Sequence, residues 1–550
     1  MPKNTKTAKT PYLFHRNSLG AYLILIIGLF YGCASIQTPQ GGPKDTTPPK
    51  VLKMEPKNLT TNFNSKKIII EFDEYIKLNN EFKEFSISPE QDKAPILKGN
   101  NTKKLEITLQ DSLEKNTTYT LNFGKSITDI NESNELKNFT YVFSTGPTLD
   151  SLSISGRIKN SLTGEPELDA VVFILPVERD SLFGKKKPSI YTTTDSSGLY
   201  KMSNLRKGTY KIYALKEKSG DKIYQQVNDE VGFIKEPIVL DKNLDSINIS
   251  VFKELASTFR IIDRKLNTDG SITMNFNQNL IKPEISVTEP VNIDAGKKVQ
   301  FNKGNDSVKV WLNDLSFDSV KVAIKDQGKV LETIKFTRGK RDTYTRNITA
   351  TDNTDNSVLN PNRTLKLDFN LPIDNIDLTK VILLEDSIPR KGFTIEKDTS
   401  DILSYNVKYP WKKNEPYILK FEAGATTGIF NSKNKEINKN FKLGSNDDYA
   451  TLTLNVVVPD SSKNYILQLV NEKKEVVVAS RRILKSTSII LANYKPASYY
   501  VRIIYDDNKN GVWDTGNVSK GTQPEKIWYA PKEFSIRPNF DIREKVEIPK

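Results

Sequence analysis

The stretch from residue 51 to residue 146 is a succession of short segments in which apolar and polar residues mostly alternate. Segments 68–72, 104–109, 117–123 and 139–144 are rich in β-branched and aromatic residues, and Asn, Asp, Gly and Pro fill the gaps between them. Alternation with a period of two is typical of strands with one buried face, and no helical periodicity extends over ten residues. Several such strands within about 100 residues predict a β-sandwich.

The same pattern returns later in the chain. Four positions recur in one register at an offset of 298: Tyr119, Phe123, Phe143 and Gly146 correspond to Tyr417, Phe421, Phe441 and Gly444. Four matches at one offset predict an internal repeat, whose aromatic residues we expect to fill sandwich cores. A third, shorter copy is expected at 254–345, where 274–277 and 336–339 echo strands of the first copy.

Residues 115–121, 127–131 and 143–146 carry a family resemblance. They read K-N-T-T-Y-T-L, I-T-D-I-N and F-S-T-G. These motifs resemble the bacterial Ig-like domain of surface-layer proteins, which has a T-x-Y strand, a D-x-x-G turn and a closing F-x-T-G strand. Asn131 and Glu132 stand where that turn commonly has glycine. The resemblance implies Ig-like sandwiches at 50–147 and, through the repeat, at 254–345 and 346–446.

A different pattern occupies residues 148–253. It contains 154–158 (I-S-G-R-I), 170–173 (A-V-V-F), 194–200 (T-D-S-S-G-L-Y) and 205–210 (L-R-K-G-T-Y). This resembles the carboxypeptidase-regulatory, transthyretin-like fold, a sandwich without catalytic residues. Residues 447–550 repeat the design more loosely: Asn204, Leu205, Gly208 and Tyr210 correspond to Asn493, Tyr494, Ala497 and Tyr499 at an offset of 289. We therefore expect a diverged second transthyretin-like sandwich there.

Residues 1–32 read as a targeting segment. A basic head is followed by thirteen apolar residues at 19–31, which is too short to span a bilayer as a helix, and then by Gly32 and Cys33. This resembles a bacterial lipoprotein signal, which implies an acylated Cys33 and anchoring in a membrane. Ala34 follows, not the aspartate of the Gram-negative retention rule, so the resemblance implies the outer membrane; the leaflet stays open. Residues 33–49, rich in Pro and Gly, form the predicted tether.

Two missing side-chain types exclude most catalytic chemistry. The one histidine, His15, lies in the predicted leader, and Cys33 is the one cysteine. A Ser-His-Asp triad, a Cys-His pair and a zinc site built on Cys or His are therefore excluded from the mature chain. Removing the four basic leader residues from the 81 of the full chain leaves a net charge of +10 against 67 acidic residues. This excess is spread thinly, so we predict no nucleic-acid partner.

One loop has the spacing of a cation site. Counting from Asp506, oxygen-bearing side chains occupy positions 1, 3, 5 and 9 (Asp506, Asn508, Asn510 and Asp514), with Gly511 at position 6. This is the order of a calcium loop, but Asn517 replaces the bidentate glutamate at position 12, so any affinity should be weak, roughly 10⁻⁴–10⁻³ M. The alternative is a purely structural turn, because Asn-Gly is a strong hairpin signal. Both interpretations stay open.

The sequence supports three hypotheses of function. The first is a non-enzymatic, lipid-anchored outer-membrane scaffold or accessory subunit, whose partner is a membrane β-barrel protein of a transport, assembly or export complex. The second is a surface adhesin or glycan-binding lipoprotein. The third, and weakest, is a hydrolase that uses only carboxylates, with Asp506 and Asp514 as its acid pair. Apart from weak calcium, no cofactor is predicted.

Overall fold

The computed structural model describes residues 44–226, 228–339 and 342–550. Their regular secondary structure is almost entirely β-strand, with short 3-10 turns and one α-helix of four residues, α2 (Glu81–Glu84). The all-β prediction is therefore confirmed. Within the same residues no helix has the length and apolar character needed to cross a membrane. The predicted leader, Cys33 and the first part of the tether lie outside the described residues.

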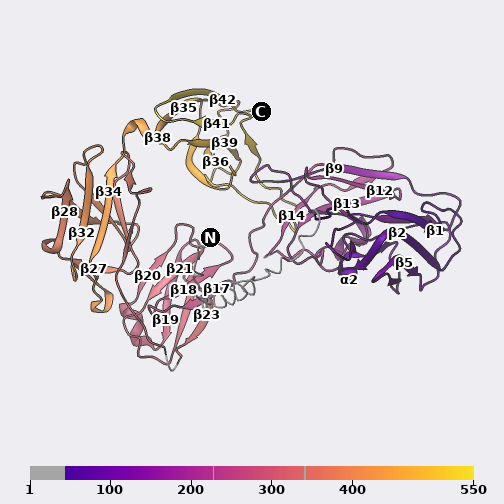
Figure 1. Ribbon diagram of the computed structural model, residues 1–550, viewed down its shortest axis with the longest axis horizontal. Helices are drawn as coiled ribbons and strands as arrows, with labels where there is room; N and C mark the ends of the chain where they lie inside the picture. The colour runs from indigo at the N-terminus through magenta and orange to yellow at the C-terminus, as the bar shows by residue number, and fades with distance from the viewer. Residues whose placement is uncertain (1–43, 227, 340–341) are drawn as a thin grey trace, which may run out of the picture.

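The strands form five successive β-sandwiches, which we number domains 1 to 5 in chain order. Each has a separate cluster of buried apolar side chains. Figure 1 shows that domains 2 to 5 follow one another around a closed circuit, from which domain 1 projects at the indigo end. The C-terminal domain thus returns to the neighbourhood of β14 in domain 2.

Domain 1 packs two sheets around one core. The larger sheet has the order β1 (Val51–Glu55), β2 (Lys67–Leu78), β5 (Thr102–Thr108), β4 (Ile96–Lys98), with β7 (Ile127–Asp129) also pairing with β2; the smaller has β3 (Ser86–Ser88), β6 (Thr118–Asn122), β8 (Thr140–Ser144). Alternate residues of β2, namely Ile68, Ile70 and Phe72, are fully buried. Each such side chain contributes roughly 1.5–3 kcal/mol on burial.

Domains 3 and 4 repeat this design. Domain 3 has the sheets β17 (Ile261–Leu266), β18 (Ile272–Phe276), β21 (Ser307–Trp311), β20 (Lys298–Phe301) and β19 (Pro283–Glu289), β22 (Ser319–Asp326), β23 (Lys329–Thr337). The first sheet of domain 4 has the order β24 (Ala350–Asp352), β26 (Leu365–Phe369), β31 (Ser404–Lys408), β30 (Thr394–Lys397). Its second sheet has the order β25 (Val358–Leu359), β34 (Ile437–Leu443), β32 (Pro416–Phe421), β28 (Val381–Glu385), β29 (Ile388–Arg390). A further pair of strands is formed by β27 (Ile373–Ile376) and β33 (Thr426–Gly428).

The two copies of the first predicted repeat lie in equivalent surroundings. In domain 1, Tyr119 lies opposite Phe143 with ring centroids 5.3 Å apart, and its hydroxyl accepts the N–H of Glu114 at 2.9 Å. In domain 4 the pair Tyr417 and Phe441 has centroids 5.5 Å apart, and the hydroxyl accepts the N–H of Lys412 at 2.7 Å. The repeat is therefore one of packing and of hydrogen bonding.

Domains 2 and 5 share a second topology. Domain 2 has the sheets β11 (Tyr191–Thr193), β10 (Val171–Pro176), β13 (Gly208–Lys216), β14 (Glu230–Phe233), with β15 (Ile238–Leu240) also on β13, and β12 (Leu199–Leu205), β9 (Leu152–Asn160), β16 (Ile249–Val251). Domain 5 has β37 (Val477–Ile483), β36 (Asn464–Asn471), β39 (Ala497–Asp506), β40 (Ile527–Tyr529), with β41 (Phe534–Ile536) on β39, and β38 (Thr487–Tyr494), β35 (Ala450–Val457), β42 (Asp541–Glu547). In both domains the first and last strands pair in parallel.

Local details follow the offset of 289 as well. Asn204 and Asn493 each lie near the end of the fourth strand of their domain and both have a positive φ, 57° and 56°. The Tyr210 hydroxyl donates to the Arg206 carbonyl, and the Tyr499 hydroxyl donates to the carbonyl four residues before it in the same way. The shared turn shows one design used twice, while the transthyretin-like assignment of both domains stays a prediction.

Neighbouring domains also meet through side chains. Trp311 belongs to β21 of domain 3 but is fully buried in the apolar cluster of domain 4. Gln300 of domain 3 accepts the N–H of Ile402 at 3.0 Å. Asn360 of domain 4 donates to the Asn493 carbonyl of domain 5 at 3.0 Å. These contacts fix the path by which the chain reaches its last domain.

Candidate functional site

The residues predicted to hold calcium lie where the chain leaves β39. Asp506 is the last residue of that strand, and the segment 507–526, which we call the second docking loop, leads to β40. In Figure 1 a yellow loop runs from domain 5 toward β14 of domain 2 at this place. The structure therefore puts the predicted site at a junction between two domains.

Three of the predicted side chains converge within this loop. The side-chain amides of Asn508 and Asn510 both donate to the same Oδ2 of Asp514, each at 2.7 Å. The fourth, Asp506, accepts the N–H of Gly511 on its Oδ2 at 3.0 Å, and its Oδ1 is buried with no hydrogen-bond partner. Within the described residues, no group of three or more His, Cys, Asp and Glu side chains is arranged to hold a metal ion.

Sequence reasoning missed Glu525, which closes the loop from its far end. Its Oε1 accepts the N–H of Asp507 at 2.9 Å and its Oε2 accepts that of Asp514 at 3.0 Å. Burial, together with the negative charges of Asp514 and Asp506, raises the pKa of the Glu525 carboxyl. Glu525 lies well beyond the last position of the motif, so spacing within the motif gives no signal for it.

The rest of the second docking loop lies against domain 2. Thr515 Oγ1 donates to the Lys253 carbonyl at 2.5 Å, and Gln523 donates to the Phe233 carbonyl at 2.8 Å. Trp513 and Val518 pack against an apolar cluster that otherwise belongs to domain 2. Trp513 of domain 5 thus completes an apolar cluster of domain 2.

A second set of contacts joins the same two domains. Arg502 is 3% exposed and reaches the Leu162 carbonyl of domain 2 at 3.2 Å, and the Tyr529 hydroxyl donates to that carbonyl at 2.7 Å. Lys474 forms an ion pair with Glu165 at 2.5 Å. Because the partners in each contact come from opposite ends of the circuit, these contacts close the ring of domains 2 to 5.

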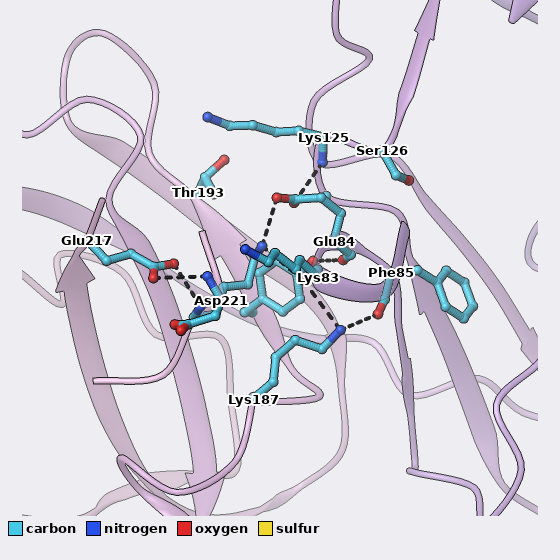
Figure 2. Close-up of polar contacts among 12 residues, drawn as sticks. Lys83, Glu84, Phe85, Lys125, Ser126, Lys187, Thr193, Glu217 and Asp221 are labelled. Carbon is cyan, nitrogen blue, oxygen red and sulfur yellow. Dashed lines mark hydrogen bonds and ion pairs between the residues drawn. The ribbon is translucent and has the colours of Figure 1, made fainter. Parts of the chain in front are cut away.

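Domain 2 uses its own β13–β14 connection to hold domain 1, and we call this connection the first docking loop. Figure 2 shows the polar cluster at this junction. Lys222, which is 3% exposed, pairs with Glu84 of α2 at 3.0 Å, and the other Glu84 oxygen accepts the N–H of Lys125 at 3.1 Å. Removing one partner of such a buried ion pair is strongly destabilising, because the remaining charge is left buried without a counter-ion or solvent.

Lys187 completes the cluster near the C-terminal end of α2 (Figure 2). Its ammonium donates to the Phe82 and Phe85 carbonyls at 2.8 and 2.7 Å. Burial, and then the nearby positive charge of Lys222, lowers the pKa of Lys187 to about 8. The junction between domains 1 and 2 therefore contains a group that titrates at mildly alkaline pH.

Beside this junction lies a cleft of about 570 Å³ between domains 1 and 2. Domain 1 lines it with hydroxyl and amide side chains, including Thr117, Thr118 and Asn122, and domain 2 contributes Arg179, Arg206 and Tyr210. Such a lining offers hydrogen-bond donors and acceptors to a polar ligand.

The comparison with protein families agrees with the Ig-like prediction for domain 1. Residues 45–145 match the model of the bacterial Ig-like domain, so that part of the prediction is confirmed. No curated protein matches the chain in sequence.

Several solved structures resemble the chain weakly. One is surface layer protein SbsC, domains 1-6, at 12% identity over 88% of this chain and 67% of that one, with a TM-score of 0.14. Another is BcpA, the major pilin subunit of Bacillus cereus, at 11% identity over 72% and 99%, with a TM-score of 0.14. A third is the Bacteroides ovatus protein SGBP-B in complex with a mixed-linkage heptasaccharide, at 10% identity over 63% and 88%, with a TM-score of 0.18. Likenesses with TM-scores this low carry no argument about function.

Proposed function

We propose that this chain is a non-enzymatic scaffold protein, anchored in the outer membrane by acyl chains on Cys33. The observation that carries the proposal is the closed circuit of domains. Two docking loops, a tryptophan shared between domains and several hydrogen bonds hold the sandwiches against one another. A chain braced in this way presents long β-surfaces at fixed spacing, which suits a protein that holds a partner in place.

The side-chain inventory supports the same proposal. The described residues contain neither histidine nor cysteine. Two carboxylates at the junctions have structural partners: Glu84 pairs with Lys222 of the neighbouring domain, and Glu525 accepts two backbone N–H groups of its own domain. Such carboxylates stabilise structure and are not free to transfer protons to a substrate.

The partner we propose is a membrane β-barrel protein of a transport, assembly or export complex. The test is affinity purification of the tagged full chain from detergent-solubilised native membranes, with Cys33→Ala as the matched control. We expect a barrel protein in constant ratio with the wild type, whereas the control should leave the membrane fraction and lose the partner. Recovery of the wild-type chain alone would contradict the proposal.

A second candidate function, a surface adhesin or glycan-binding protein, is supported by the cleft between domains 1 and 2. Hydroxyl and amide groups on one wall and the guanidinium groups of Arg179 and Arg206 on the other suit a polar, hydroxyl-rich ligand. Retention on polysaccharide columns tests it: wild type should bind, and Arg206→Ala, which removes an exposed guanidinium from the cleft, should bind less. If neither is retained, this candidate is wrong.

A further inference from the structure

We propose that the second docking loop binds a calcium ion through Asp506, Asn508, Asn510 and Asp514, together with the Val512 carbonyl. This goes beyond the scaffold role and does not depend on it. Calcium takes six to eight oxygen ligands, drawn from carboxylates, side-chain amides, backbone carbonyls and water. A set of two carboxylates, two amides and one carbonyl, completed by water, is of this kind.

The buried carboxylate of Asp506 is the first observation that points to a cation. Asp506 is 1% exposed, and its Oδ1 has no hydrogen-bond partner. A buried, ionised oxygen without a partner is strongly unfavourable. Arg482 lies 3.9 Å from the other oxygen, Oδ2, and its side chain is 48% exposed, so it compensates the buried charge only in part. A cation at the bare oxygen would remove the cost.

The geometry of the neighbouring side chains is the second observation. Asn508 and Asn510 both direct their side chains at one oxygen of Asp514. Their amide oxygens accept the N–H groups of Asn510 and Val512, at 3.0 and 2.8 Å, and each retains a second lone pair. The side chains at positions 3 and 5 of the motif thus both contact the carboxylate at position 9.

The backbone makes a sharp turn at Gly511, as a calcium loop does at its sixth position. Gly511 has a φ of +84° and donates its N–H to the first ligand, Asp506, at 3.0 Å. Only glycine takes this conformation readily, and a Cβ on Gly511 would lie 2.2 Å from the Arg482 guanidinium. The chain therefore wraps around the carboxylate of Asp506.

Glu525 acts as a positioning residue and not as a ligand. By holding the N–H groups of Asp507 and Asp514, it fixes both ends of the loop and adds a negative charge beside the site. The arrangement also explains why no site built from acidic side chains alone is found in the described residues, because the amide and backbone oxygens must complete the shell. Magnesium, which needs a stricter octahedron, should bind less well.

The test is calcium titration of the full chain, purified in detergent and washed with EGTA, by calorimetry and by its thermal unfolding midpoint. We expect a dissociation constant of about 10⁻⁴–10⁻³ M and a midpoint that rises with calcium. Asp514→Asn should weaken binding roughly tenfold by removing one ligand charge. Asp507→Asn, an equal charge change at position 2 whose backbone alone contacts Glu525, is the matched control and should bind like the wild type.

Terbium luminescence gives a second readout, because Trp513 lies within the loop and can sensitise a bound terbium ion. Sensitised emission that calcium displaces in the wild type, and that falls in Asp514→Asn, would support the site. Absence of binding up to about 10 mM calcium, well above the expected affinity range, would overturn the proposal. Equal binding by Asp514→Asn and Asp507→Asn would overturn it too, because the ion would then lie elsewhere.

Discussion

The two docking loops occupy the same position in two copies of one fold and solve the same problem differently. The first follows β13 and the second follows β39. An acidic residue stands at the start of each, Glu217 as the first residue after β13 and Asp506 as the last residue of β39, at the offset of 289 that relates the two domains. In each, the opening acid accepts the N–H of the residue five positions on: Lys222 at 2.8 Å in domain 2, Gly511 at 3.0 Å in domain 5. Both of these residues have a positive φ.

The difference lies in what occupies that fifth position after the acid. Domain 2 has a lysine, whose buried ammonium crosses to Glu84 of domain 1. Domain 5 has a glycine, which leaves the loop acidic, and the segment beyond it docks through Trp513 and backbone hydrogen bonds. The same type of turn can therefore join two domains either by a buried ion pair or by apolar packing beside a group of acidic side chains.

The largest expected effect is that of Glu84→Gln, which would leave the Lys222 ammonium buried and unpaired. Removing one partner of a buried pair costs about 3–5 kcal/mol, whereas Glu84→Leu combined with Lys222→Met should recover most of that loss. Hydrogen exchange at β11, beside the junction, measures the loss of protection. The control is Glu55→Gln, in a pair whose side chains are 62% and 60% exposed. Equal protection in Glu84→Gln and the control would mean that the ion pair does not hold domain 1.

The second junction should respond to shape and not to charge. Gly516→Ala would place a Cβ 2.5 Å from the Phe252 ring of domain 2, so the loop must move away. Overpacking of this kind typically costs about 1–3 kcal/mol. Proteolysis of the loop should speed up, while Gly304→Ala, whose Cβ meets nothing closer than 3.7 Å, should leave the rate unchanged. An unaltered rate in Gly516→Ala would contradict the docking described here.

Alkaline pH should distinguish the first junction from the second. The pKa of Lys187 is lowered to about 8 by burial, below the value of about 10.4 in an unfolded chain. Between these values the unfolded state binds more protons, so the stability of the first junction should rise with pH and reach its full value above the unfolded pKa. Unfolding midpoints measured from pH 7.5 to about 9.5 should show this rise in the wild type but not in Lys187→Met. The same slope in both proteins would contradict the assignment.

The smallest effect is expected at the exposed rim of the second junction. Glu165 is 55% exposed in its pair with Lys474. Such pairs contribute about 0.2–1 kcal/mol. Lys474 also lies over the rings of Tyr500 and Tyr529, at 4.6 and 4.7 Å, so Lys474→Met should cost more than Glu165→Gln. Chemical denaturation of both variants measures the two losses of unfolding free energy. A larger loss in Glu165→Gln would mean that the ion pair contributes more than the contacts of Lys474 with the two tyrosine rings.

Much of this fold can be predicted from sequence because its determinants are local or periodic. The alternation at 68–72 predicts β2, and the offsets of 298 and 289 place Tyr417 and Tyr499 in the settings of Tyr119 and Tyr210. These residues mark turns and cores that each domain forms by itself.

The junctions could not be predicted in that way. Glu84, Lys222 and Glu525 are charged residues that lie in or beside turns, where charge usually indicates solvent exposure. Glu84 and Lys222 belong to different domains and lie far apart in the chain, and no periodic pattern connects such positions. Trp513 was the one signal in the sequence, because a large aromatic side chain in a polar loop needs an apolar surface.

Zero-length cross-linking of the full chain with a carbodiimide, followed by mass spectrometry, tests the closed circuit most directly. Lys474 and Glu165, in contact at 2.5 Å although they belong to domains 5 and 2, should yield a joined peptide, as should Lys532 and Glu544 within domain 5. We predict both products, with the first lost on Gly516→Ala. Finding the product within domain 5 without the one between domains 5 and 2 would contradict the account.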